Sequence, residues 1–114
     1  MRIRISTVVF AAVTLAAAAA SADKIERTFK AKCASCHGED GKGQTTKGKE
    51  MGVRDMTAAA WQKDLTDDKI QKSIEDGVDR TEGGKKQQMD PYKDKLKPDQ
   101  VAELVKYIRG LAAK

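Results

Sequence analysis

The stretch Cys33-Ala34-Ser35-Cys36-His37 decides the fold of this 114-residue chain. It holds both cysteines and the single histidine of the sequence. Two residues between the thiols match the separation of the two vinyl groups of a porphyrin, and a histidine that follows at once can place its imidazole beneath the iron. The pattern C-x-x-C-H therefore predicts haem c, one per chain, attached covalently through Cys33 and Cys36 and ligated by His37.

Three other uses of these thiols fit less well. A redox-active dithiol usually follows a strand in a βαβ unit, and no strand pattern precedes Cys33. A zinc site needs four ligands from well-separated pairs, whereas Cys36 and His37 are adjacent. A disulfide across two residues would strain the local helix and stabilise it little. Covalent attachment of haem is the interpretation that uses all three side chains.

The N-terminal segment is typical of an export signal. Two arginines near the start precede an alanine-rich apolar run, and Ala20-Ser21-Ala22 offers a small-x-small cleavage site. The run is shorter than the ~18 to 20 apolar residues that cross a bilayer, so we expect cleavage rather than a membrane anchor. The chain is thus expected to consist of a signal peptide at 1–22 and one exported, periplasmic domain at 23–114, or a domain in an equivalent compartment, with no integral membrane segment.

Charge and composition limit the kinds of partner. The chain carries 22 basic and 17 acidic residues, and removal of two arginines with the signal leaves 20 against 17, a net charge of +3. Nucleic-acid binding needs a concentrated basic stripe, which the sequence lacks. Aromatic residues make up only 4% of the chain, so a buried porphyrin would complete the core. Without haem, the chain is expected to be unfolded or molten.

Apolar spacing predicts an all-α domain with three helices. The first, at about 23–33, carries an apolar stripe that leads into the cysteine motif. The middle helix, at 67–76, has Thr66 as its N-cap and Gly77 as its stop. The last, at about 98–111, has apolar residues at spacings of three and four.

The segments between these helices are predicted to be loops. The stretch 38–52 is polar and rich in glycine, with no regular period. The stretch 55–65 allows at most a short helical turn. The stretch 78–89 has a pair of glycines and no apolar residue between Val78 and Met89, so an extended loop is expected there.

A methionine is the expected second axial ligand of the iron. No second histidine exists in the chain, which excludes bis-histidine ligation within a monomer. A soft, neutral thioether favours ferrous iron, and the mature chain offers Met51, Met56 and Met89. Met89 is preferred because it precedes Asp90 and Pro91, and this proline stiffens a non-helical stretch. Met56 can instead be a core residue, and Met51 lies in the glycine-rich segment.

The chain resembles the class I c-type cytochromes over nearly all of 23–114. Phe29 stands four residues before Cys33, where that family commonly has an aromatic residue, and the region around Met89 is similar to its methionine loop. The resemblance implies a cytochrome c-like fold, in which crossed N- and C-terminal helices, a middle helix and loops surround one haem. Phe29 and Tyr107 are expected to meet where the two helices cross.

The resemblance also bears on two single positions. It makes Trp61 a candidate to donate its indole N–H to a haem propionate, although an ordinary half-buried aromatic residue explains Trp61 equally well. Members of the family often carry proline directly after the ligand methionine, whereas Asp90 intervenes here.

The function implied is that of an electron carrier, not an enzyme, with ligation by His37 and Met89. It would act as a monomer between larger redox proteins. Lysines around the haem could dock an acidic partner, but acidic residues are interspersed among them, so a solvated surface is an equal alternative. These lysines are Lys30, Lys32, Lys42, Lys85, Lys86 and Lys93.

A haem peroxidase or small-ligand sensor is the alternative function. Either would need an open or labile sixth position on the iron, and peroxide chemistry would also need a distal acid–base group. The sequence has no histidine for the second role. A methionine bound to the iron would block the position that both alternatives require.

Overall fold

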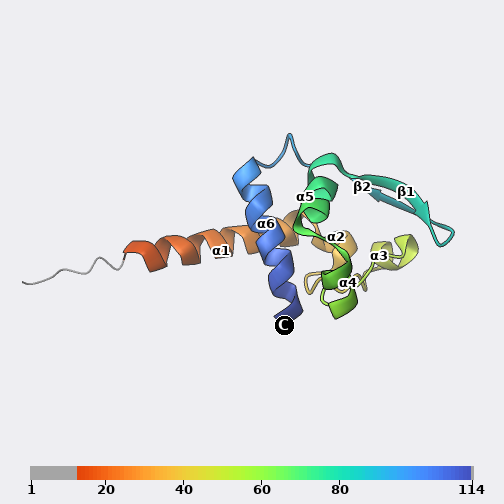
Figure 1. Ribbon diagram of the computed structural model, residues 1–114, viewed down its shortest axis with the longest axis horizontal. Helices are drawn as coiled ribbons and strands as arrows, with labels where there is room; N and C mark the ends of the chain where they lie inside the picture. Colours follow the sequence, from red (N-terminus) through yellow and green to blue (C-terminus); the bar gives the residue numbers. More distant parts are fainter. Residues whose placement is uncertain (1–12, 114) are drawn as a thin grey trace, which may run out of the picture.

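A long helix crossed by the C-terminal helix organises the structure (Figure 1). The computed structural model describes residues 13–113, and the side chains of 22–112. Within the described part, no helix has both the length and the apolar character needed to span a membrane. The elements are α1 (Val13–Lys32), α2 (Ala34–His37), α3 (Thr46–Met51), α4 (Ala59–Asp64), α5 (Asp67–Asp76), β1 (Val78–Glu82), β2 (Lys85–Met89), α6 (Pro98–Gly110) and a 3-10 turn (Leu111–Ala113).

Helix α1 begins earlier than the sequence analysis placed it. It was expected to start near residue 23, but it starts at Val13. The alanine-rich segment 13–22 has the highest intrinsic helix propensity in the chain, so it continues the helix toward the N-terminus. Of the predicted signal peptide, residues 1–12 lie outside the described part of the chain.

Helix α6 confirms the predicted last helix. Pro98 stands at its first position, where a missing N–H costs nothing, and the side chain of Gln100 accepts a hydrogen bond from the backbone N–H of Lys97 at 2.9 Å. One face of the helix is buried against α1 and α5. The buried residues are Val101, Leu104, Val105 and Ile108.

Helix α5 was also placed correctly. The side chain of Thr66 accepts a hydrogen bond from the N–H of Lys69 at 3.2 Å, and Asp67 and Asp68 lie in the first turn, where they complement the helix dipole. Gly77 ends the helix with φ of 76°. These are local signals, and they were sufficient to locate the element.

Two helices lie in segments expected to be mainly loop. In 38–52, α3 forms because the side chain of Thr45 accepts a hydrogen bond from the N–H of Gly48 at 2.9 Å and Gly52 ends the helix with φ of 63°. The prediction of a loop there was therefore wrong over residues 46–51. In 55–65 the expected short helical turn is α4.

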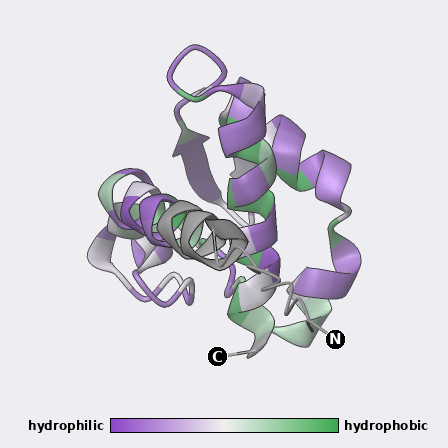
Figure 2. Cartoon of the chain, turned by 90° about the vertical axis from the view of Figure 1, so that its left-hand side faces the viewer, coloured by the Kyte–Doolittle hydropathy of each residue, from purple (hydrophilic) through white to green (hydrophobic). Residues whose placement is uncertain are grey.

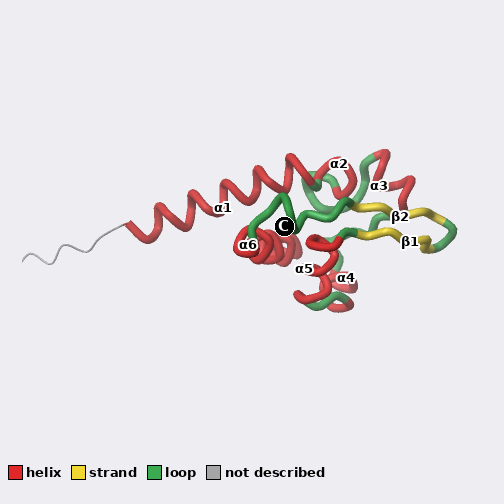
Figure 3. Tube along the Cα trace, turned by 90° about the horizontal axis from the view of Figure 1, so that it is seen from above, coloured by secondary structure: helices red, strands yellow, loops and turns green. Residues whose placement is uncertain are grey.

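The prediction of a loop at 78–89 was wrong. This segment is the antiparallel hairpin β1–β2, in which Val78 pairs with Met89 and Arg80 with Gln87 (Figure 3). Gly83 and Gly84 have φ of 58° and 76°, the positive values that a two-residue hairpin turn of type I′ requires. The hairpin was missed because nearly all its residues are polar, so the strands show no apolar alternation.

The core lies where α1, α5 and α6 meet and extends to α4. Phe29, Val101, Leu104 and Leu111 are the most deeply buried side chains. By contrast, the strand visible in Figure 2 is hydrophilic along its length. The predicted all-α class therefore holds for the packed part of the molecule, and the hairpin is an addition outside the core.

Candidate haem site

A cavity of about 490 Å³ brings together the residues expected to hold a cofactor. Cys33, Cys36 and His37 line it from the end of α1 and from α2, and Met89 lines it from the end of β2. Sites for small molecules and cofactors commonly have volumes of ~300 to 1,000 Å³. His37 and Met89, which are 52 residues apart in the sequence, thus line the same cavity.

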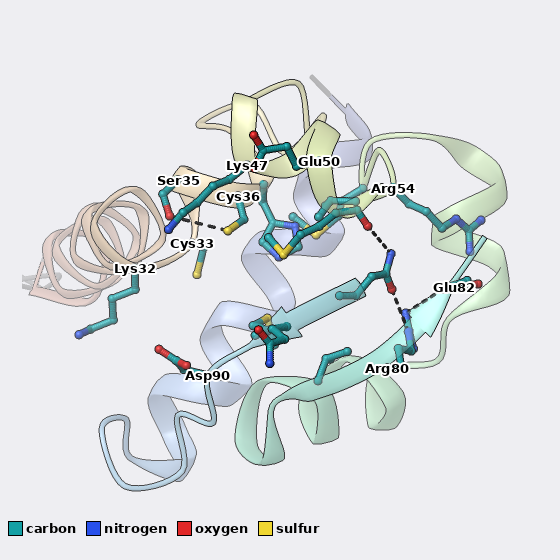
Figure 4. A pocket seen from close by; sticks show the side chains of 18 of the residues that line it. Lys32, Cys33, Ser35, Cys36, Lys47, Glu50, Arg54, Arg80, Glu82 and Asp90 are labelled. Atoms are coloured by element: carbon teal, nitrogen blue, oxygen red, sulfur yellow. Dashed lines mark hydrogen bonds and ion pairs between the residues drawn. The ribbon is translucent and has the colours of Figure 1, made fainter. Parts of the chain in front are cut away.

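The two thiols are free and half-buried. Figure 4 shows the side chains of Cys33 and Cys36 next to each other at one end of the pocket. Burial raises the pKa of Cys33 to about 11, so its thiol stays protonated near neutral pH. A redox-active dithiol usually has one cysteine with a lowered pKa, and Cys33 lacks this property. Both thiols line the cavity, where each can bond to a group that fills it.

The imidazole of His37 suits a metal ligand. Burial lowers the pKa of His37, which keeps the ring neutral, and a neutral imidazole is the form that binds a metal. Its Nδ1 atom is buried without a hydrogen-bond partner in the described part of the chain. A buried polar atom without a partner is costly, by about 1–3 kcal/mol. Such an imidazole is expected where the ring binds a cofactor rather than another part of the protein.

All three candidate methionines line the cavity. Met56 is only 4% exposed and belongs to the hydrophobic core, so much of its side chain is engaged in packing. Met51 ends α3, and Met89 is half-buried at the end of β2. His37 and Met89 line the same cavity, but so do Met51 and Met56. The choice among the three sulfur atoms stays a prediction.

Two arginines in the cavity wall were missed by the sequence analysis. Arg54 pairs with Asp64 at 3.1 Å. Arg80 pairs with Glu82 at 3.4 Å, as Figure 4 shows. Both lie beside the cavity with Trp61, which is 8% exposed. Arg80 faces the cavity because it has the same strand parity as Val78. The Gly83-Gly84 pair could have predicted a hairpin, and the alternation of side chains along its strands would then have placed Arg80 on the same face as Val78.

The lysines expected to form a docking ring are not equivalent. Lys32 lines the cavity, whereas Lys30 pairs with Glu26 at 3.2 Å and Lys85 donates a hydrogen bond to the carbonyl of Lys49 at 3.0 Å. A lysine that is already engaged contributes less to a free positive surface. Lys32 is therefore the best placed of these three to meet a partner near the cavity.

Comparisons with known proteins agree with this geometry. A family model described as Cytochrome c matches residues 22–112. A solved structure described as the KustC0563 c-type cytochrome is 32% identical, has a TM-score of 0.64, and aligns over 75% of this chain and 94% of its own. A Kustc0563 mutant is 33% identical, with a TM-score of 0.63 and coverage of 76% and 96%. No curated protein sequence matches the chain.

Proposed function

We propose, on the premise that this chain belongs to the cytochrome c family, that it carries single electrons between redox proteins, with His37 and Met89 as the axial ligands. Membership in the family brings one covalently attached haem c, and the cytochrome c-like fold is confirmed, with the β1–β2 hairpin added to it. The observation that carries the proposal is the cavity in which both thiols, His37 and Met89 meet.

The residues of the cavity suit the cofactor in distinct ways. Cys33 and Cys36 would form the two thioether bonds, and His37 would supply a neutral imidazole nitrogen to the iron. The bound haem supplies one-electron chemistry between ferric and ferrous iron. Met56 and Trp61 are buried and apolar, so they exclude water from one side of the cavity. We propose that Arg54, Arg80 and the indole of Trp61 meet the propionates.

A methionine ligand would suit an electron carrier for a physical reason. A thioether raises the reduction potential and occupies the position that oxygen, peroxide or a small ligand would need. Met89 is the last residue of β2, and Pro91 follows two residues later, so strand pairing and a proline restrict the backbone on its two sides. An electron carrier benefits from this because each transfer then requires little rearrangement.

The remaining parts of the proposal concern location and partners. We propose that residues 1–22 are a cleaved signal peptide, that 23–114 form the exported domain in the periplasm or an equivalent compartment, and that this domain acts as a monomer. Its redox partners would approach near Lys32, and an acidic partner surface would be steered there. Association rates that fall with ionic strength would support this docking surface.

Exchange of each methionine for leucine tests the ligand assignment. The holoprotein should show the far-red ferric absorption band of an iron–thioether bond, and Met89→Leu should abolish it. Met51→Leu and Met56→Leu are matched controls that should retain the band. Loss of the band in a control variant instead would move the ligand to that position. A high-spin wild-type protein that binds cyanide at once would favour a peroxidase or sensor.

A further inference from the structure

A set of hydrogen bonds joins the hairpin to the C-terminal end of α3. The side-chain amide of Gln87 donates to the carbonyl oxygens of Met51 and Gly52 at 3.0 Å and 3.2 Å. Its own carbonyl oxygen accepts a hydrogen bond from Nε of Arg80 at 2.9 Å. Gln87 is thus the side chain through which β1, β2 and α3 meet.

These contacts satisfy groups that α3 cannot satisfy by itself. The last four carbonyls of an α-helix have no partner within the helix. The chain turns away at Gly52, so no helical N–H reaches the carbonyl of Met51, and the side chain of Gln87 donates to it instead. Lys85 adds a second hydrogen bond, at 3.0 Å, to the carbonyl of Lys49, which also accepts from the N–H of Gly52. The hairpin is mostly exposed and polar, so these bonds, rather than apolar packing, hold it against α3.

Helix α3 is in turn fixed to the haem-attachment motif. A Cβ atom at Gly48 would lie 2.3 Å from the carbonyl oxygen of Cys36 and 2.5 Å from that of Gly43, so α3 packs backbone against backbone there. The side chain of Thr45 donates to the carbonyl of Ser35 at 2.7 Å. Helix α3, whose C-terminal end Gln87 binds, is therefore packed directly against the backbone of Cys36.

Gln87 is linked to Met89 through their positions on the same face of β2. Gln87 and Met89 are two residues apart in β2, so their side chains lie on the same face, and both line the cavity. The other side of Met89 is held separately, because the N–H of Tyr92 donates to the carbonyl of Ile74 at 2.9 Å. Besides the strand pairing with β1, Gln87 is the residue nearest to Met89 on its N-terminal side whose side chain is hydrogen-bonded to α3.

We propose that Gln87 is a positioning residue that holds Met89 over the cavity and slows the departure of its sulfur from the iron. This inference rests on the proposed function, since it requires Met89 as the ligand. Gln87 does not contact the reacting atoms. It acts indirectly, because it holds β2 against α3, and α3 packs against Cys36.

The test uses ferric holoprotein and three variants. Gln87→Leu removes every hydrogen bond of the side chain at similar size. Gln87→Glu keeps an acceptor for Arg80, loses the donors to Met51 and Gly52, and turns a negative charge toward these two carbonyl oxygens. Thr81→Val is the matched control, because Thr81 is an exposed residue of the same hairpin that does not line the cavity, and valine has nearly the same shape. The readouts are the far-red band and the rate of cyanide binding, which requires the sulfur to leave first.

Both Gln87 variants should bind cyanide about tenfold faster than wild type, and their far-red band should weaken. The Thr81→Val protein should match wild type in both readouts. If a Gln87 variant loses thermal stability but retains the wild-type band and cyanide rate, Gln87 is merely structural and the inference is overturned. Should Gln87→Leu not fold, the same comparison with Gln87→Glu decides. If Met89→Leu leaves the band intact, the ligand assignment fails instead, so the two failures are distinguishable.

Discussion

The rings of Phe29 and Tyr107 lie with their centroids 5.0 Å apart and their planes inclined at 47°. Phe29 belongs to α1 and is completely buried, and Tyr107 belongs to α6, so the contact marks the crossing of the two helices. Tilted aromatic pairs at this separation are favourable beyond the area they bury. Phe29 is also one turn from Cys33, so the crossing supports the start of the haem motif.

Phe29→Ala should lower the free energy of unfolding of the holoprotein by about 3–5 kcal/mol, because it removes a fully buried ring at this crossing. Denaturant titration followed by far-UV circular dichroism measures the change. Phe29→Leu is the control and should cost less, since most of the apolar volume remains. A loss in Phe29→Ala no larger than that in Phe29→Leu would contradict the role given to the ring.

Gly48→Ala should destabilise the holoprotein by about 1–3 kcal/mol and reduce the yield of attached haem. Its Cβ would meet two backbone carbonyl oxygens, which cannot move aside as a flexible side chain would. Gly110→Ala is a matched control, because nothing lies within 4 Å of the added Cβ. That variant should be neutral or slightly stabilised. Equal thermal unfolding of the two variants would rule out the close packing of α3.

Arg109 joins α6 to the segment between α4 and α5. Its guanidinium donates to the carbonyl oxygens of Gln62, at 2.6 Å, and of Leu65, and it pairs with Asp67 at 2.7 Å. Arg109→Met should cost about 1–3 kcal/mol, because these partly buried carbonyls lose their donors. Arg109→Lys should recover little, since an ammonium group lacks the planar fork. Full recovery by lysine in urea titrations would show that charge alone matters.

Asp55 should contribute to stability in a pH-dependent way. Its carboxylate accepts hydrogen bonds from the N–H and hydroxyl of Thr57 at 2.8 Å and 2.6 Å, and the hydroxyl contact is the larger cause that lowers the pKa of Asp55. A carboxyl with a lowered folded-state pKa stabilises fully above its unfolded-state pKa, and the contribution is lost as the pH falls through the folded-state value.

Asp55→Asn should therefore be less stable than wild type at neutral pH, and the difference should disappear in acid. Urea midpoints measured across the acid range test this. A difference that grows as the pH falls would contradict the assignment. Because Asp55 is only partly buried, solvent screening keeps the effect small.

Removal of the haem should abolish cooperative folding. The cavity of about 490 Å³ would lose its filling, and the hydrophobic core around it is small. A protein with Cys33→Ala and Cys36→Ala, expressed without attached haem, should show no sharp thermal transition by circular dichroism. A compact variant that melts cooperatively would refute this expectation.

Local chemistry explains which features could be predicted. The motif from Cys33 to His37 specifies a cofactor by spacing alone, and α5 and α6 carry caps and apolar periods within their own residues. The same kind of signal was present but overlooked for α3, where Thr45 is the cap. It was also present at the hairpin, where Gly83-Gly84 is the turn.

By itself, the sequence determined the haem-attachment motif and the helices that begin and end with their own caps. Through its resemblance to the class I c-type cytochromes, it also implied the crossing at which Phe29 and Tyr107 meet. Only the tertiary structure decided which side chains meet around the cavity. Gln87, Arg80 and Arg109 depend on partners far away in the chain, and no local pattern specifies a polar side chain's distant acceptor. Apolar burial follows a period along the chain, whereas these hydrogen bonds depend on three-dimensional proximity.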